Sequence, residues 1–416
     1  MKEGMNAGKS IIYVVYALLL GGFTGGFIWL FLRIVSLGIG FVWNYVPSVV
    51  DIPCYTIIMC LAGGVIAGIL RIMFGSYPES METVIAKVKR DGKYPYDKTF
   101  IIVLCAFVPL IFGASVGPEA GLTGVVVGLC YWVGDKLRFA GSQLGSFTSL
   151  GISAVLGVLF GSPLFGIAAD IEPKTDDKAE TAVLPKPFEI FGKIIAVSGG
   201  LLVYFLLGQI FGSGMSFTQL AVGEITNFDR LLGIPFILLG VILGMLYAGF
   251  RKLSYLLFEK LSKTKLLTFL STVLGGLMLG IIGTILPMTM FSGEEEISEI
   301  AETYMQYAPA MLIITGVAKL FLTSFCIESG LKGGNLFPMI FSGVAIGYGI
   351  SMLVGSSPTM TIATITAALL AVNMRKPLAV SLLLLLCFPV RVIPWMIIAS
   401  FISANIPLPK FLKVKE

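Results

Sequence analysis

Long apolar runs, many of them about the length of a membrane span, constrain the fold of this chain more than any other feature. A helix needs about 20 apolar residues to cross a bilayer. Runs near that length follow one another at residues 11–43, 54–74, 100–116, 146–171, 188–211, 231–250, 266–291, 309–325, 339–354, 362–386 and 390–406. Only 13% of the 416 residues are charged, whereas soluble domains carry about 25%. We therefore expect an all-α polytopic membrane protein.

The charged loops predict an orientation for these spans. Basic residues gather in segments 75–98 and 251–265 and in the tail, 407–416, whereas segment 292–302 holds five glutamates and no basic residue. The positive-inside rule places the basic segments and both chain termini in the cytoplasm, and the acidic segment outside. Lys2 and Lys9 precede the first apolar run without a small-residue cleavage site, which is typical of a first membrane helix and not of a signal peptide. We expect a single membrane domain, 1–416, ending in a short cytoplasmic tail.

Composition excludes several functional classes. The sequence has no histidine, which rules out a histidine zinc protease and a Ser-His hydrolase. An aspartyl enzyme would have to pair Asp135 with Asp170, an arrangement that the sequence does not favour. The six cysteines contain no CxxC pair, so they predict neither a disulfide framework nor a metal site. A net charge of +5 is too modest to indicate nucleic acid as a partner. We expect no enzyme and no organic cofactor.

The chain contains a faint internal repeat, with approximate halves 45–225 and 226–406. One shift of 214 residues aligns four pairs: Ser115 with Ser329, Leu122 with Leu336, Pro163 with Pro377, and Leu164 with Leu378. Each half therefore has a serine-led, glycine-rich break, then an apolar stretch, then a Pro-Leu break. Weak internal symmetry with interrupted helices is typical of transporters, whose binding site lies at the breaks.

The first break, residues 113–122 (GASVGPEAGL), places a carboxylate between two apolar runs. A buried charge at membrane depth is costly, so an intramembrane glutamate indicates a function by default. Pro118 suits the first turn of a helix, which leaves Glu119 at a helix N-terminus, where N–H groups and the helix dipole favour anions. Glu119 would occupy an anion site and leave it when protonated. The alternative is that Glu119 only caps its helix.

The second break, residues 328–338 (ESGLKGGNLFP), is rich in glycine. Gly333 and Gly334 allow backbone N–H groups to turn toward a ligand, and Asn335 and Leu336 would begin the next helix. Glu328 and Lys332 are most simply a local ion pair. Lys332 could instead raise the local concentration of anions.

Four segments in this order resemble motifs of the CLC family of chloride channels and anion/proton antiporters. Residues 75–79 (GSYPE) approximate its G-S-G-x-P motif, and residues 117–121 (GPEAG) its G-(K/R)-E-G-P gate motif. Residues 161–167 (GSPLFGI) resemble its A-P-L-x-G-I stretch, and residues 334–338 (GNLFP) its G-x-F-x-P motif. No single motif is complete, but their order and spacing extend across most of the chain.

The resemblance implies two inverted-topology repeats of tilted and broken helices, assembled as a homodimer in lipid, in a bacterial inner membrane. It implies that Glu119 is the external gating glutamate. The anion, a bound chloride or another halide, would be held by residues of the first and last motifs: Ser76 or Gly75, Gly334, Asn335, Leu336 and Phe337.

Three departures from the family pattern weaken the proton pathway. The internal proton-transfer glutamate is replaced by Pro173, although the adjacent Glu172 could substitute for it or could simply face water. Pro409, not the pore tyrosine, follows Pro407 and Leu408, and no acidic residue follows the second Pro-Leu stretch. Pro173 favours a passive channel. Small chains of bacterial type without a regulatory tail resemble the exchangers more often, so we expect chloride transport with proton exchange ahead of a passive channel. Fluoride/proton exchange is a further alternative.

A different class of function is a cation-coupled solute transporter. Such a protein also uses broken helices and a site near the bilayer midplane. It would need anionic ligands for a cation within the spans, and Glu119, Asp170 and Glu328 are the candidates. Dependence of transport on a cation would distinguish this class from an anion transporter.

Overall fold

The computed structural model describes residues 7–91, 94–136, 144–173, 187–212, 220, 224–385 and 387–414, and among these it contains helices and no strand. The first half of the chain forms α1 (Ala7–Ile39), a π turn (Gly40–Tyr45), α2 (Val46–Val49), α3 (Tyr55–Phe74), α4 (Met81–Asp91), α5 (Thr99–Ile111), α6 (Glu119–Lys136), α7 (Leu144–Leu159), α8 (Pro163–Ile171) and α9 (Pro187–Phe211).

The second half forms α10 (Asn227–Leu231), α11 (Gly233–Leu261), α12 (Lys265–Ile285), α13 (Glu294–Thr303), α14 (Pro309–Ser329), α15 (Leu336–Val354), α16 (Pro358–Met374), α17 (Pro377–Leu384) and α18 (Ile393–Asn405). Short 3-10 turns lie at Pro287–Thr289, Tyr304–Gln306, Val390–Val392 and Lys410–Leu412. The expected all-α fold is confirmed. Seven helices in the described part of the chain are long and apolar enough to cross a membrane.

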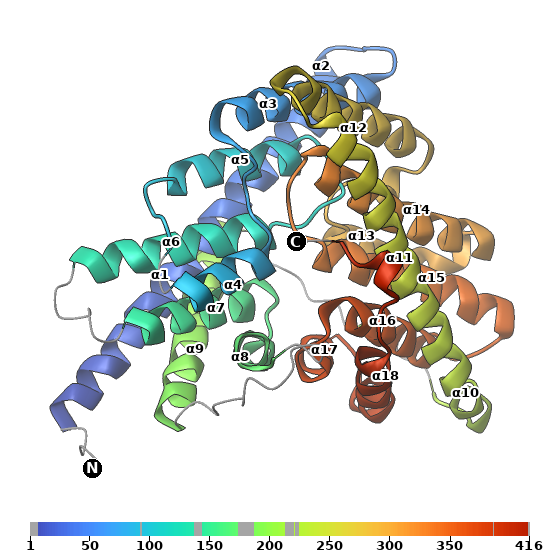
Figure 1. The fold of residues 1–416 in the computed structure, drawn as a ribbon. Coiled ribbons are helices and arrows are strands. Elements are labelled where there is room, and N and C mark those ends of the chain that lie inside the picture. Colours follow the sequence, from blue (N-terminus) through green and yellow to red (C-terminus); the bar gives the residue numbers. More distant parts are fainter. Residues whose placement is uncertain are drawn as a thin grey trace.

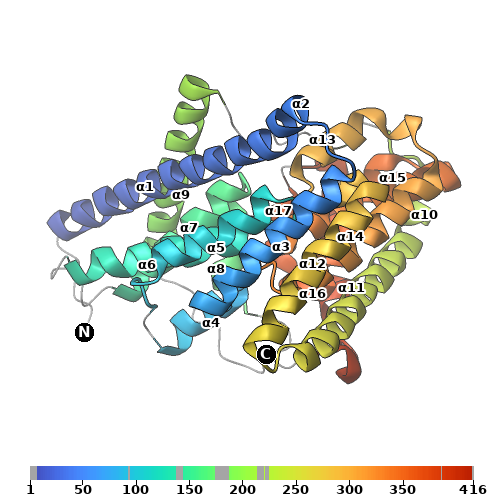
Figure 2. The ribbon, with the colours of Figure 1, turned by 90° about the horizontal axis from the view of Figure 1, so that it is seen from above.

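The two halves lie side by side and meet along a central junction (Figure 1). Helix α3 packs along α12 at one end of the junction, and α8 packs against α17 at the other end. Figure 2 shows α3 and α12 running next to each other in the view from above. Their backbones approach closely because small residues meet there: a Cβ atom at Gly276 would lie 2.4 Å from the carbonyl oxygen of Cys60. This is the usual way in which membrane helices associate.

Two of the predicted apolar runs are divided into separate helices. Runs 146–171 and 362–386 each form two helices in the structure, and the divisions lie at the Pro-Leu breaks predicted from the repeat, where Pro163 and Pro377 begin the second helices. Gly161 has a φ of +57° and Pro163 begins α8; Arg375 has a φ of +59° and Pro377 begins α17. A residue in the left-handed region ends a helix, and proline then starts the next because it needs no N–H partner.

The predicted repeat agrees with the helix boundaries. The shift of 214 residues that aligns Pro163 with Pro377 also aligns Leu144, where α7 begins, with Pro358, where α16 begins. The breaks before α6 and before α15 occupy corresponding places in the two halves. Helix α6 itself was missing from the predicted spans, because its glycines and its polar residues interrupt the apolar run.

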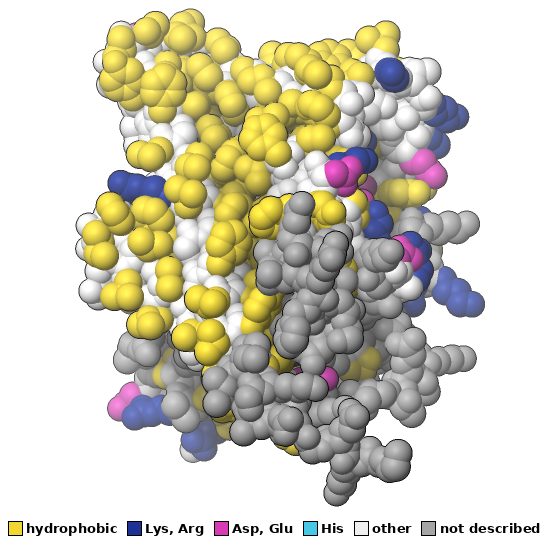
Figure 3. Space-filling view, turned by 90° about the vertical axis from the view of Figure 1, so that its left-hand side faces the viewer, with side chains coloured by type: hydrophobic (Ala, Val, Ile, Leu, Met, Phe, Trp, Pro, Cys, Tyr) yellow, Lys and Arg dark blue, Asp and Glu magenta, His cyan; other side chains and the backbone are white. Residues whose placement is uncertain are grey.

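The outer surface is apolar, as expected for a chain that lies in lipid. Figure 3 shows hydrophobic side chains over most of the described part of one face, with charged side chains mainly near its margins. Large apolar side chains of α1 and α9, such as Leu19 and Ile210, are about two-thirds exposed, at 67% and 69%. A water-soluble protein would not expose so large a continuous apolar surface.

Candidate anion-binding site

The two glycine-rich breaks predicted from the sequence lie against each other at the junction. The N–H of Gly117 donates to the carbonyl of Gly334 (2.8 Å), and the N–H of Gly334 donates to the carbonyl of Gly117 (2.7 Å). The hydroxyls of Ser115 and Thr323 are 3.1 Å apart and tie the first break to α14. These contacts bring the N-termini of α6 and α15 together, although the two helices begin 217 residues apart in the chain.

Glu119 is the first residue of α6, and its carboxylate lies at the N-terminus of α15. Its Oε1 accepts a hydrogen bond of 2.7 Å from the N–H of Leu336, and the side chain is only 1% exposed. The second oxygen, Oε2, is buried and has no hydrogen-bond partner among the described residues. A backbone N–H at a helix N-terminus favours a negative group, so the carboxylate lies where a small anion would be stabilised.

Gly117 and Gly334 give the carboxylate its space. A Cβ atom at Gly334 would lie 1.8 Å from Cδ of Glu119, and one at Gly117 would lie 2.0 Å from its Oε2. Neither distance is compatible with a side chain. The carboxyl group is therefore held between two glycine backbones that no other residue type could provide without moving it.

Asn335 occupies the N-cap position of α15 but does not cap it. Its side chain makes no capping hydrogen bond; instead, its Nδ2 donates to the hydroxyl of Tyr247 in α11 (3.1 Å). An N-cap asparagine normally accepts from the N–H two or three residues later. Because Asn335 turns away, the first N–H groups of α15 are left for another acceptor, and Glu119 provides one.

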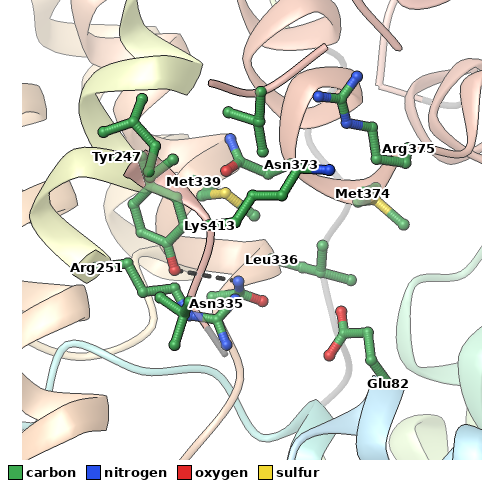
Figure 4. A pocket seen from close by; sticks show the side chains of 14 residues that line it. Glu82, Tyr247, Arg251, Asn335, Leu336, Met339, Asn373, Met374, Arg375 and Lys413 are labelled. Atoms are coloured by element: carbon green, nitrogen blue, oxygen red, sulfur yellow. Dashed lines mark hydrogen bonds between the residues drawn. The ribbon is translucent and has the colours of Figure 1, made fainter. Parts of the chain in front are cut away.

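Leu336, whose N–H donates to Glu119, also lines a cavity of about 290 Å³ (Figure 4). It is lined from α4, α11, α15, α16 and the C-terminal segment, by Glu82, Tyr247, Ala248, Arg251, Asn335, Leu336, Met339, Asn373, Met374, Arg375, Leu408, Leu412, Lys413 and Val414. Three of these side chains are basic and one is acidic, so the cavity favours anions.

The position of the cavity agrees with the predicted orientation. Glu82, Arg251 and Lys413 come from the three basic segments that the positive-inside rule assigns to the cytoplasm. The acidic helix α13, assigned to the outside, lies near the first break instead: the N–H of Phe291, three residues before α13, donates to the carbonyl of Gly113 (3.0 Å). Glu119 thus lies between a predicted outer acidic helix and a predicted inner basic cavity.

A buried lysine fixes the segment that precedes the outer acidic helix. The Nζ of Lys319 in α14 donates to the carbonyls of Met288 and Met290, at 3.0 and 2.8 Å, and lies 4.3 Å from the ring centre of Phe341. Burial, together with the nearby carboxylates of α13 and of Glu119, raises the pKa of Glu294, the first residue of α13, to about 8.

Gly75 and Ser76 lie at the C-terminal end of α3, where both are exposed, and neither lines the cavity. Gly75 has a φ of +98° and ends the helix. One turn earlier, Arg71 donates to the carbonyl of Ser329 (2.7 Å), which fixes the end of α3 to the end of α14 just before the second break. The role of Gly75 and Ser76 in anion binding stays a prediction.

Glu172 lies at a different helix N-terminus from Glu119. It follows the last residue of α8 and is half-buried, and its two oxygens accept from the N–H groups of Leu378 (2.9 Å) and Ala379 (2.7 Å) at the start of α17. Pro173 beside it is exposed. Glu172 does not line the cavity, so the structure does not bring it together with Glu119.

The other carboxylates considered for a cation site have basic partners. Asp170 in α8 forms a buried ion pair with Lys193 in α9 (2.6 Å), and the hydroxyl of Ser149 donates to it as well. Glu328 pairs with Arg251 at 3.7 Å; the ion pair expected with Lys332 was therefore wrong. The side chain of Asp135 lies outside the described part of the structure. No cluster of metal-ligating side chains is found among the described residues.

Sequence reasoning missed Tyr247 and Arg251. Both project from α11 into the cavity, one helical turn apart. A tyrosine and an arginine spaced by four residues near the end of an apolar run share one helix face, and that spacing was the available signal. Only the fold reveals that this face meets Asn335, 88 residues away.

Comparisons with known proteins agree with this architecture. The family model described as "Voltage gated chloride channel" matches residues 63–407. YfeO proteins of Escherichia coli, provisionally named as ion-transport proteins, are 24% identical over 272 residues, for example in strains IAI39 and SMS-3-5. The match covers 65% of this chain and 62% of the relatives' own length.

Solved structures with the same fold are similar over almost the whole chain. A slow cyanobacterial Cl⁻/H⁺ antiporter has a TM-score of 0.78 at 17% identity, with 96% of both chains covered. A CLC-type fluoride/proton antiporter has a TM-score of 0.75 at 16% identity, with 97% of both chains covered. A eukaryotic CLC transporter has a TM-score of 0.71 at 15% identity, covering 97% of this chain and 74% of the other.

Proposed function

We propose that this chain, which belongs to the voltage gated chloride channel family, exchanges chloride for protons across a membrane and uses Glu119 as its gate. The family match over residues 63–407 is the basis for anion transport. The observation that carries the proposal is the hydrogen bond from the Leu336 N–H to the carboxylate of Glu119, made in a site where the side chain is 1% exposed.

The proposed gate works by competition between two negative groups. When Glu119 is ionised, its carboxylate occupies the N–H of Leu336 and excludes a halide. When Glu119 takes up a proton, it loses the charge that the helix N-terminus favours, and a halide replaces it. Its oxygen Oε2, which has no partner in the described structure, is available to receive that proton.

Exchange requires that Glu119 be reached by protons from both sides. The cavity extends to Leu336, whose N–H holds the carboxylate. Its volume of about 290 Å³ is many times the ~30 Å³ that a water molecule occupies. Water in the cavity would therefore carry protons between the cytoplasm and Glu119, which makes a second glutamate at the position of Pro173 unnecessary.

A passive chloride channel is the second candidate. Both oxygens of Glu172 are held by N–H groups of α17, so Glu172 is poorly placed to pass protons onward. If water does not carry protons through the cavity, Glu119 would gate chloride without exchange. Fluoride is the alternative anion, because one of the solved structures with this fold is a fluoride/proton antiporter.

We further propose that the protein is a homodimer in a bacterial inner membrane, with both termini in the cytoplasm. The basic residues of segments 75–98 and 251–265 support this orientation. Helices α9, α17 and α18 expose apolar side chains, including Phe205, Leu378 and Phe401, that a second copy could cover. The proposed partners are a halide, protons and lipid.

The test uses purified protein in liposomes, with chloride efflux and external pH recorded together. The parent should move chloride outward and protons inward, and Glu119→Gln should abolish the proton movement. The matched control is Glu259→Gln, an exposed glutamate of α11, which should behave as the parent does. Chloride flux without proton movement in the parent would identify a channel. If neither chloride nor fluoride moved, anion transport itself would be wrong.

A further inference from the structure

Tyr247 is a buried residue whose hydroxyl faces the cavity. Its side chain is 1% exposed and belongs to the middle of α11, yet it lines the cavity beside Asn335 and Leu336 (Figure 4). Buried tyrosine hydroxyls usually have hydrogen-bond partners. The partner here is the amide of Asn335, which donates from Nδ2 at 3.1 Å.

This hydrogen bond leaves the O–H proton of Tyr247 available as a donor. Because Asn335 donates, the oxygen of Tyr247 accepts, and its own O–H proton needs a different acceptor. No residue of the described structure accepts that proton. Tyr247 is only 1% exposed, so the free donor remains at the wall of the cavity that Leu336 also lines.

The surroundings of this donor are those of a site for an anion. Arg251 lies one turn further along α11 and also lines the cavity, with Lys413 on the C-terminal segment (Figure 4). Arg251 also forms an ion pair with Glu328, at 3.7 Å. Glu82 is the one acidic side chain in the lining.

The volume of the cavity is compatible with a small hydrated anion. At about 290 Å³ it admits a small inorganic anion together with several waters. Dehydration would begin only where fixed donors replace the water, which is at Tyr247, Asn335 and the N-terminus of α15. A single O–H donor suits a monovalent, weakly basic anion such as chloride, bromide or nitrate better than it suits the strongly hydrated fluoride.

We propose that the Tyr247 hydroxyl is a ligand for the transported anion on the cavity side of Leu336, and that Asn335 holds it in the donating orientation. The inference rests on the proposed anion transport and adds a specificity-determining residue to it. The hydroxyl replaces one water of the hydrated anion before that anion reaches the N–H of Leu336, which Glu119 occupies.

The first test is Tyr247→Phe, which removes the hydroxyl and keeps the ring. We expect the chloride KM to rise by about tenfold, because a hydrogen bond to a charged group is lost. The preference for chloride over fluoride should fall as well. The control is Tyr255→Phe on the same helix, whose hydroxyl donates to Glu259 outside the cavity. A chloride KM and a selectivity within twofold of the parent for Tyr247→Phe would overturn the inference.

A second measurement keeps the hydroxyl and its hydrogen bond with Asn335, and so does not depend on Tyr247→Phe folding. 3-Fluorotyrosine is introduced at position 247, and its ¹⁹F resonance is followed while chloride replaces gluconate. A shift that saturates with chloride is expected, and no shift would contradict the proposed contact. Glu119→Gln, assayed in parallel, distinguishes failure of the proposed gate from failure of the proposed Tyr247 contact. If Glu119→Gln leaves proton coupling intact, the proposed gate is wrong, independently of the result at Tyr247.

Discussion

Glu119 and Glu172 are two carboxylates of the first half that each lie at the N-terminus of a helix of the second half. Glu172 uses both oxygens, which accept from Leu378 and Ala379, and it is half-buried. Glu119 uses one oxygen, which accepts from Leu336, and it is almost fully buried. At Glu172 both carboxylate oxygens have hydrogen-bond donors, whereas at Glu119 only one oxygen has a donor.

The difference shows how a helix N-terminus can serve stability at one place and transport at another. A carboxylate whose two oxygens both accept hydrogen bonds behaves as a helix cap, and it would lose those hydrogen bonds if it left the helix N-terminus. A buried carboxylate with an empty oxygen is costly while ionised, so protonation and displacement by another anion are within reach. Glu119 also lies between two glycines and close to a cavity, whereas Glu172 lies beside neither.

The largest effect is expected from filling the space around Glu119. In Gly334→Ala the new Cβ would lie 1.8 Å from Cδ of Glu119, so the carboxyl group must leave the N–H of Leu336. We expect proton-coupled chloride flux in liposomes to fall to the background. Gly40→Ala, which has no atom within 4 Å of the added methyl group, is the control. Coupled flux at the parent rate in Gly334→Ala would show that the glycine pair does not hold the gate.

A smaller and different effect is expected at Glu172. Glu172→Ala removes the acceptor for two N–H groups of α17, and loss of a helix cap costs about 1 kcal/mol. We expect a lower unfolding temperature in detergent, with a smaller decrease for Glu172→Gln, which keeps one acceptor oxygen. Proton coupling in liposomes should persist in both variants. If Glu172→Gln moved chloride without protons, Glu172 would be a proton-transfer residue and the comparison with Glu119 would no longer hold.

The smallest effect concerns the outer acidic helix. Because the pKa of Glu294 is raised to about 8, the folded protein binds this proton more tightly than the unfolded chain does. The contribution of Glu294 to stability is then present at low pH and lost as the pH rises toward and through about 8. Between the ordinary glutamate pKa of 4.5 and about 8, we expect the unfolding temperature to fall less steeply with pH for Glu294→Gln than for the parent. Equal slopes would contradict the raised pKa.

Local sequence patterns could predict much of the fold and the central contact. Apolar runs with few charges predicted membrane helices, and a carboxylate after Gly-Pro predicted a helix beginning at Glu119, which the structure confirms. The resemblance to known motifs paired that break with residues 334–338, and the structure brings Glu119 to Leu336. These features could be predicted because glycine, proline and buried charge carry local physical meaning.

Contacts between distant segments could not be predicted in the same way. Tyr247 is an ordinary aromatic residue in an apolar helix until the fold places it against Asn335. Glu328 lies close to Lys332 in the sequence, but the packing of α11 against α14 gives it Arg251 as an ion-pair partner. The hydrogen bonds of Glu172 to α17 likewise depend on the way α8 and α17 meet. The tertiary arrangement determines which hydrogen-bond or ion-pair partner each of these side chains has.

The central claim is that the carboxylate of Glu119 and a transported anion compete for the N–H of Leu336. The most direct measurement is anomalous diffraction from crystals grown in bromide, comparing the parent with Glu119→Ala. The account predicts a bromide within hydrogen-bond distance of the Leu336 N–H in the variant, at the position that Oε1 of Glu119 occupies in the parent. An empty site in the variant, filled only by water, would contradict it.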